Sequence, residues 1–153
     1  MNILKHFAST YEEGLHAKGA LSTQFLLTEL EVQAGNNVLD FGCGSATSLV
    51  RLAATYPDCE IYGVDACETM LRSARSRLKF CGLSDVIHLT QIEAAQKLPF
   101  NDAFFDCIYI ESVLAIQSDD SLPSLLTELS RVLKTWWQVP MQRNTMAQLC
   151  QYK

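Results

Sequence analysis

Two acidic residues and two glycines stand where strand patterns give way to helix patterns, and together they could hold a nucleoside. In VLDFGCGSATS, Asp40 closes an apolar run, and Gly42 and Gly44 permit a tight turn that a ligand can approach closely. The helix that follows offers free backbone N–H groups. A second apolar run, EIYGVD, ends in Asp65, 25 residues after Asp40. A carboxylate there can accept hydrogen bonds from both hydroxyl groups of a ribose.

Each of these features also has a simpler interpretation. The need of the backbone for positive φ angles is enough to explain a Gly-x-Gly turn, and helix capping is enough to explain an acid at a strand end. Because both features occur in one strand–helix–strand unit, a ligand site is the favoured hypothesis.

Helix and strand patterns alternate along the chain and would position these residues. Apolar spacing predicts helices over residues 17–31, 46–55 and 67–81, the last ending before Gly82, and another that opens at Pro123. Apolar runs predict strands within residues 37–42, 60–65, 85–92 and 104–110. In the last strand, Phe105, Cys107 and Tyr109 should share one face. This alternation is typical of a parallel α/β sheet, whose ligands bind at the carboxyl ends of the strands.

Composition favours one globular domain and a small-molecule or protein partner. The chain has 153 residues, 48% of them hydrophobic, and a net charge of −5, which argues against nucleic acid or an anionic membrane as a partner. The cations at 72, 75, 77 and 79 are interpreted as the solvated face of their helix. No apolar run is long enough to span a membrane, so a cytoplasmic location is expected. Six cysteines without a Cys-x-x-Cys pair indicate reduced thiols and no metal site.

Four motifs occur in order, and they identify a family resemblance. They are VLDFGCGSA, IYGVDACETML, KLPFNDAFFDCIY and LTELSRVLK. Over about residues 11–134 the chain resembles class I S-adenosylmethionine-dependent methyltransferases, in particular the small-molecule group related to ubiquinone and arsenite methyltransferases. The resemblance implies a Rossmann-like parallel sheet with helices on both faces and a cofactor-binding domain over residues 1–134. It also implies direct in-line transfer of a methyl group from S-adenosylmethionine to a small-molecule acceptor, leaving S-adenosylhomocysteine.

The resemblance also assigns site residues. Asp65 would bind the ribose, Ala66 and Met70 would flank the adenine, and Glu93 would stand in for the acid that the family carries at position 94. The full cofactor-binding set is Asp40, Gly42, Cys43, Gly44, Asp65, Ala66, Met70, Glu93, Ala94 and Ile110. The third glycine of the first motif is replaced by Ala46. Candidates to take a proton from the acceptor are His16, Glu111 and Tyr11, although His16 could equally be a surface histidine.

The sequence departs from the family after Lys134. There the family continues with Pro-Gly-Gly and a fifth strand, whereas this chain continues Thr-Trp-Trp. Because tryptophan has a single codon, Thr-Trp-Trp read one base later gives Gly-Gly, with proline permitted before it. We therefore expect residues 135–153 to be an atypical, out-of-frame tail, with the C-terminal strands of the family's seven-stranded sheet missing. A native tail, helical over about 141–149, is the alternative.

Other functions remain as alternatives at this point. A dehydrogenase would need a glycine where Thr47 stands and a hydride-transfer pair that does not follow. An inactive, truncated methyltransferase relative could bind only the cofactor or a protein partner. Without a fifth strand, the edge of the strand at 104–110 would be exposed, and self-association through it is expected.

Overall fold

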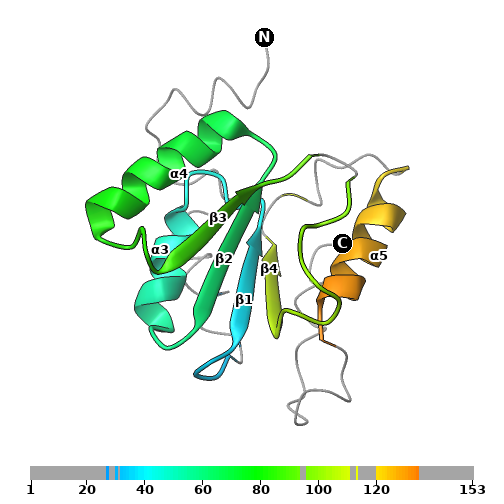
Figure 1. Cartoon of the computed structure of the whole chain (residues 1–153), viewed down its shortest axis with the longest axis horizontal. Coiled ribbons are helices and arrows are strands. Elements are labelled where there is room, and N and C mark those ends of the chain that lie inside the picture. The colour runs from blue at the N-terminus through cyan, green and yellow to red at the C-terminus, as the bar shows by residue number, and fades with distance from the viewer. Residues whose placement is uncertain are drawn as a thin grey trace.

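The computed structural model describes residues 27, 30, 32–93, 96–110, 113 and 120–134. Within them, β1 (Asn37–Phe41), β2 (Glu60–Asp65), β3 (Ile87–Gln91) and β4 (Cys107–Ile110) form a parallel sheet in the order β3-β2-β1-β4 (Figure 1). The helices are α3 (Thr47–Thr55), α4 (Glu68–Cys81) and α5 (Leu122–Val132). The expected Rossmann-like parallel sheet is confirmed.

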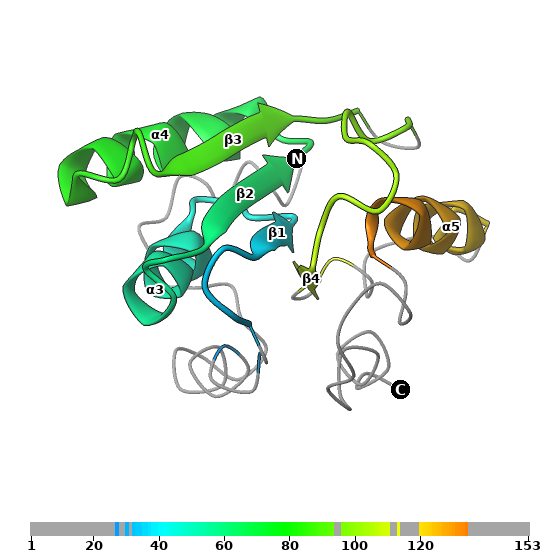
Figure 2. The ribbon, with the colours of Figure 1, turned by 60° about the horizontal axis from the view of Figure 1, so that its bottom comes forward.

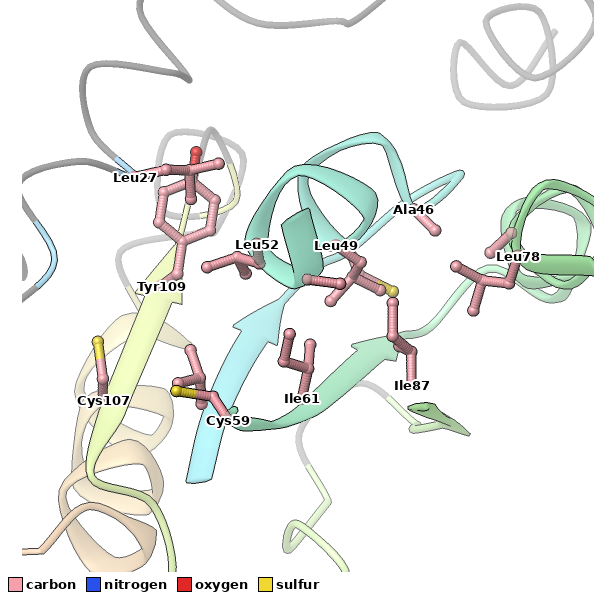
Figure 3. Packing of buried hydrophobic residues seen from close by; sticks show 14 of the residues in the cluster. Leu27, Ala46, Leu49, Leu52, Cys59, Ile61, Leu78, Ile87, Cys107 and Tyr109 are labelled. Carbon is pink, nitrogen blue, oxygen red and sulfur yellow. The ribbon is translucent and has the colours of Figure 1, made fainter. Parts of the chain in front are cut away.

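The sheet lies between two apolar layers because its strands alternate their side chains. Val38 and Ile61 face α3 and α4, where they join one buried cluster with Leu49, Leu71 and further residues of both helices (Figure 3). On the opposite face, residues such as Leu39, Val64 and Ile108 pack with Leu129 and Val132 of α5. The arrangement in Figure 2 follows from this division, with α3 and α4 away from α5. Helices on both faces of the sheet are therefore confirmed.

The start of β4 differs from the sequence prediction. The regular ladder begins at Cys107, which pairs with Val38, whereas Phe105 makes only an isolated parallel bridge to Leu133. Consequently the alternation of β4 does not extend back to Phe105. Its ring lies in the α5 cluster, while Cys107 and Tyr109 lie in the cluster of α3 and α4. The prediction that Phe105 shares their face was wrong.

The segment between β3 and β4 is fastened to α5 by one arginine. The Arg131 guanidinium donates to the carbonyl oxygens of Leu98 and Phe100 at 3.1 and 2.9 Å and to Asp102 Oδ1 at 2.6 Å. It also bonds both carboxylate oxygens of Glu128, at 3.0 and 2.6 Å. Glu128 Oε1 in turn accepts the Leu98 N–H at 2.7 Å. The LPFND and RVLK motifs thus meet in space and hold the segment that leads into β4.

The chain leaving α5 comes alongside the beginning of β4. The Lys134 N–H donates to the Phe105 carbonyl at 2.8 Å, and Lys134 Nζ contacts Asp106 Oδ1 at 2.7 Å. Asp106 Oδ2 accepts the Asn37 N–H at 2.9 Å, which ties these residues to β1 as well. The outer side of β4 is therefore met at its amino end by the chain's own residues 133–134. How residues 135–153 continue lies outside the described residues, as does most of the helix expected over 17–31.

Candidate functional site

The candidate site lies beside β1, where the order of the strands in the sheet reverses. Successive strands β1, β2 and β3 extend the sheet to one side of β1, whereas β4 pairs on its other side. In open parallel sheets, ligands bind at the carboxyl ends of the strands at such a point. Phe41 pairs with Val64 and with Ile110, so the ends of β1, β2 and β4 lie side by side. Two of the four motifs, VLDFGCGSA and IYGVDACETML, run through this end of the sheet.

The glycine loop that follows β1 is held against β2 and against the chain after β4. The N–H groups of Gly42 and Cys43 donate to the Val64 carbonyl at 2.8 and 3.0 Å. Gly42 has φ +82°, and a Cβ added to it would lie 2.1 Å from Val113 Cγ2. Gly44 has φ +53°, but nothing lies within 4 Å of the corresponding position. Open space over Gly44 would let a ligand approach the backbone.

Asp65 links this loop to the start of α4. Its Oδ2 accepts the Gly44 N–H at 2.8 Å, and its Oδ1 accepts the Cys67 N–H at 2.7 Å. The Ile92 N–H donates to the Asp65 carbonyl at 3.1 Å, which brings the end of β3 to the same point. The side chain is only half-buried. The predicted ribose-binding residue therefore lies beside the glycine loop, and its bond to the Cys67 N–H also fixes the turn that leads into α4.

Comparison with known proteins places this architecture in a family. Residues 38–135 match the model of the family described as "Methyltransferase domain". The chain belongs to the class I S-adenosylmethionine-dependent methyltransferases. The match covers most of the described residues and all four strands apart from Asn37, the first residue of β1.

Relatives and solved structures agree with this assignment. A demethylmenaquinone methyltransferase of Geobacillus kaustophilus is 34% identical over 71% of this chain and 45% of its own length. The YcgJ protein of Bacillus subtilis has a TM-score of 0.65 at 28% identity, covering 75% of this chain and 47% of that protein. A Streptomyces coelicolor geranyl diphosphate C-methyltransferase, solved with Mg²⁺, geranyl diphosphate and S-adenosyl-L-homocysteine, shares the fold at a TM-score of 0.64 and 23% identity, covering 75% and 42% of the two chains. The chain spans about half the length of the curated relatives it matches.

Asp40 at the end of β1 is buried, and the buried side chains of the glycine loop itself pack into the core beside α3. Asp40 is 2% exposed. Cys43 Sγ lies 3.0 Å from where a Cβ on Gly63 would stand, which places the thiol between the sheet and α3. Ala46, at the position of the third glycine, is fully buried with φ 67°, and its methyl group lies in the same cluster (Figure 3). Cys43 could therefore meet a ligand through its backbone, while its side chain packs inward.

The thiol of Cys43 should consequently be unreactive in the folded protein. Burial, with smaller effects from the charges of Asp40 and Asp65, raises the pKa of Cys43 well above its usual range. Because the thiolate is the form that reacts, iodoacetamide should label the exposed Cys81 and leave Cys43 unmodified until the protein is unfolded. Peptide mass spectrometry before and after denaturation measures this. Equal labelling rates at the two residues in the native protein would contradict the inward orientation.

The remaining predicted residues occupy varied positions. Ala66 is exposed two residues before α4, Met70 is buried in the first turn of α4, and Ile110 is half-buried at the end of β4. Glu93 is exposed just after β3 and accepts a hydrogen bond from Gln96. His16, Tyr11, Ala94 and Glu111 lie outside the described residues. Val113, which contacts Gly42, was not predicted, because a lone valine after a strand carries no recognisable signal.

No helix in the described part of the chain is both long and apolar enough to cross a membrane. The same residues contain no group of three or more histidine, cysteine or acidic side chains placed to bind a metal ion.

Proposed function

We propose that this chain binds S-adenosylmethionine at the carboxyl ends of β1, β2 and β4 and transfers its methyl group directly to a small molecule. The observation that carries the proposal is the position of Asp65, a half-buried carboxylate whose two oxygens bond the backbone of the glycine loop and of Cys67, just before α4. Each carboxylate oxygen has two lone pairs. Asp65 can therefore hold these two N–H groups and still accept the two hydroxyl groups of a ribose.

The residues around Asp65 fit the rest of the cofactor. Open space at Gly44 would admit the methionine portion next to the loop backbone. Exposed Ala66 and the neighbouring Met70 would flank the adenine, and Glu93 stands at the end of β3 on that side. Ile110 would face the reacting centre from β4. Ala94 and Cys43 complete the proposed set, the latter through its backbone.

The proposed chemistry needs few protein groups. S-adenosylmethionine supplies a methyl group already activated by the positive sulfur. The crevice residues then have to hold the acceptor atom in line with that methyl group, and orientation of this kind can supply about 7–11 kcal/mol of barrier lowering. His16 and Glu111 are proposed to take a proton from the acceptor where it has one to lose. The relatives named for demethylmenaquinone support a small organic molecule as the acceptor.

Calorimetry with S-adenosylhomocysteine tests the assignment of Asp65. The Asp65→Asn variant should bind this ligand more weakly by about 1.5–3 kcal/mol, the usual contribution of hydrogen bonds to a charged group. Asp58→Asn is the matched control, because Asp58 is exposed just before β2, at the amino ends of the strands. The affinity of this variant for S-adenosylhomocysteine should equal that of the wild type.

An analogue of S-adenosylhomocysteine lacking the ribose hydroxyl groups separates ribose recognition from loop positioning. The wild-type protein should bind the analogue more weakly than the natural ligand, whereas Asp65→Asn should bind both about equally. If Asp65→Asn kept the full preference for the natural ligand, Asp65 would only hold the loop and α4, and its assignment to the ribose would be wrong.

A further inference from the structure

The outward face of α4 carries a fully exposed aromatic ring among cations. Phe80 is 93% exposed, the highest value among the large apolar side chains that the structure describes. The helix buries Met70, Leu71, Ala74 and Leu78, so Phe80 points away from the sheet. In Figure 1, α4 lies at the margin of the molecule, beyond β3. The exposed ring of Phe80 is notable here because it lies on the same helix as a group of exposed cations.

The charge of this face is opposite to that of the chain. The helix has a single acid, Glu68, and four exposed cations, Arg72, Arg75, Arg77 and Lys79, in a chain whose net charge is −5. Arg75 pairs with Glu68 at 2.9 Å, but both side chains are about half exposed, so this pair leaves the local excess of positive charge intact. Arg77 Nε donates to the Ser45 carbonyl at 2.9 Å. The remaining outward positions are Cys81 and the small hydroxyl residues Thr69, Ser73 and Ser76.

We propose that this face of α4 docks on an anionic lipid surface, with Phe80 entering the interface and the cations meeting lipid phosphates. A protein partner would need an extended area of complementary shape, whereas α4 offers one apolar anchor surrounded by charges and hydroxyl groups. A lipid interface requires no such complementarity, because it accepts a single aromatic ring and is attracted to nearby lysine and arginine side chains. The net charge of −5 argued against an anionic membrane as a partner, but α4 itself carries more cations than acids. The docking does not depend on the proposed enzymatic activity.

Co-sedimentation of the full chain with vesicles tests the proposal. Binding should be strong to phosphatidylcholine vesicles that contain phosphatidylglycerol, weak to vesicles of phosphatidylcholine alone, and weakened by salt. Phe80→Ser should lower the partition coefficient by more than about tenfold, because burial of the ring is lost. Phe80→Leu should retain most of the binding. Since Phe80 is almost fully exposed, all of these variants should melt at the wild-type temperature.

Two matched lysine variants test the role of the cations. Lys79 and Lys97 are both exposed, but Lys97 lies in the segment before β4 rather than on α4. Lys79→Gln should lower the partition coefficient by about fivefold, and Lys97→Gln should leave it unchanged. Equal losses in the two variants, or equal binding to neutral and anionic vesicles, would overturn the proposal. Binding of polyglutamate without binding of vesicles would also overturn it, in favour of an acidic protein partner.

Discussion

Replacement of Arg131 by alanine should lower the free energy of unfolding by about 1.5–3 kcal/mol, the range for hydrogen bonds to a charged group, because its pair with Glu128 is partly buried. The Arg131 side chain is 18% exposed and that of Glu128 19%, so the loss leaves a poorly hydrated carboxylate behind. It also removes the donors that serve the carbonyl groups of Leu98 and Phe100. Urea unfolding followed by circular dichroism measures the change.

Two companion variants locate the source of this effect. Asp102→Asn should cost less than about 1 kcal/mol, because the Asp102 side chain is 76% exposed and the pair with Arg131 is screened by solvent. Arg131→Lys should fall between the two, since a lysine keeps the charge but cannot bridge Glu128 and two carbonyl groups at once. A loss in Asp102→Asn as large as in Arg131→Ala would show that the exposed pair with Asp102, and not the partly buried pair with Glu128, stabilises the fold.

The effect of Arg131 should depend on pH in a defined direction. The hydrogen bond from Arg131 is the main reason that the pKa of Glu128 is lowered from its ordinary value. A carboxyl group with a lowered pKa stabilises the folded state above its unfolded pKa, about 4.3, and this contribution is lost as the pH falls toward the folded value. The difference in stability between the wild type and Arg131→Ala should therefore narrow below about pH 4.3. A constant difference down to the acid transition would remove Glu128 from the explanation.

The α/β architecture could be predicted from the sequence because its elements are regular and clearly bounded. The predicted strand at EIYGVD coincides with β2, and the helix expected over 67–81 is α4, which ends at Gly82 with φ 70°. Prediction failed at the start of β4, because Phe104 and Phe105, on the other side of Asp106, continue its apolar pattern. Phe104 and Phe105 belong instead to the segment that Arg131 holds, and this contact joins residues about 30 positions apart. Such a contact leaves no local pattern in the sequence.

The candidate site was predictable in outline for a similar reason. Asp65 and the glycine loop fall at strand ends, where strand and helix patterns reveal them. The orientations of their side chains depend on tertiary contacts. For Cys43 the pattern could not distinguish a thiol in the crevice from one in the core, and the close approach of Gly63 is what places it in the core. Val113 could not be recognised because its importance comes only from its position against Gly42.

Alanine at Gly42 should destabilise the protein by about 2–5 kcal/mol. A φ of +82° is a left-handed conformation that costs an ordinary residue about 1–2 kcal/mol. In addition, the new Cβ would lie 2.1 Å from Val113 Cγ2, so the chain after β4 must shift, and overpacking of this kind costs about 1–3 kcal/mol. The two contributions have separate origins and should add. Chemical denaturation measures the sum.

Gly44→Ala is the matched control, because it separates the backbone strain from the collision. Gly44 also has a positive φ, +53°, but a Cβ there meets nothing within 4 Å, so alanine should cost only about 1–2 kcal/mol. A double-mutant cycle of Gly42→Ala with Val113→Ala should then yield a coupling energy of about 1–3 kcal/mol, equal to the steric part alone. Calorimetry should also record weaker binding of S-adenosylhomocysteine to Gly42→Ala, because the collision with Val113 would displace the glycine loop. Equal destabilisation by alanine at the two glycines, with no coupling to Val113, would mean that Gly42 is needed only for its backbone angle and that Val113 does not hold the loop.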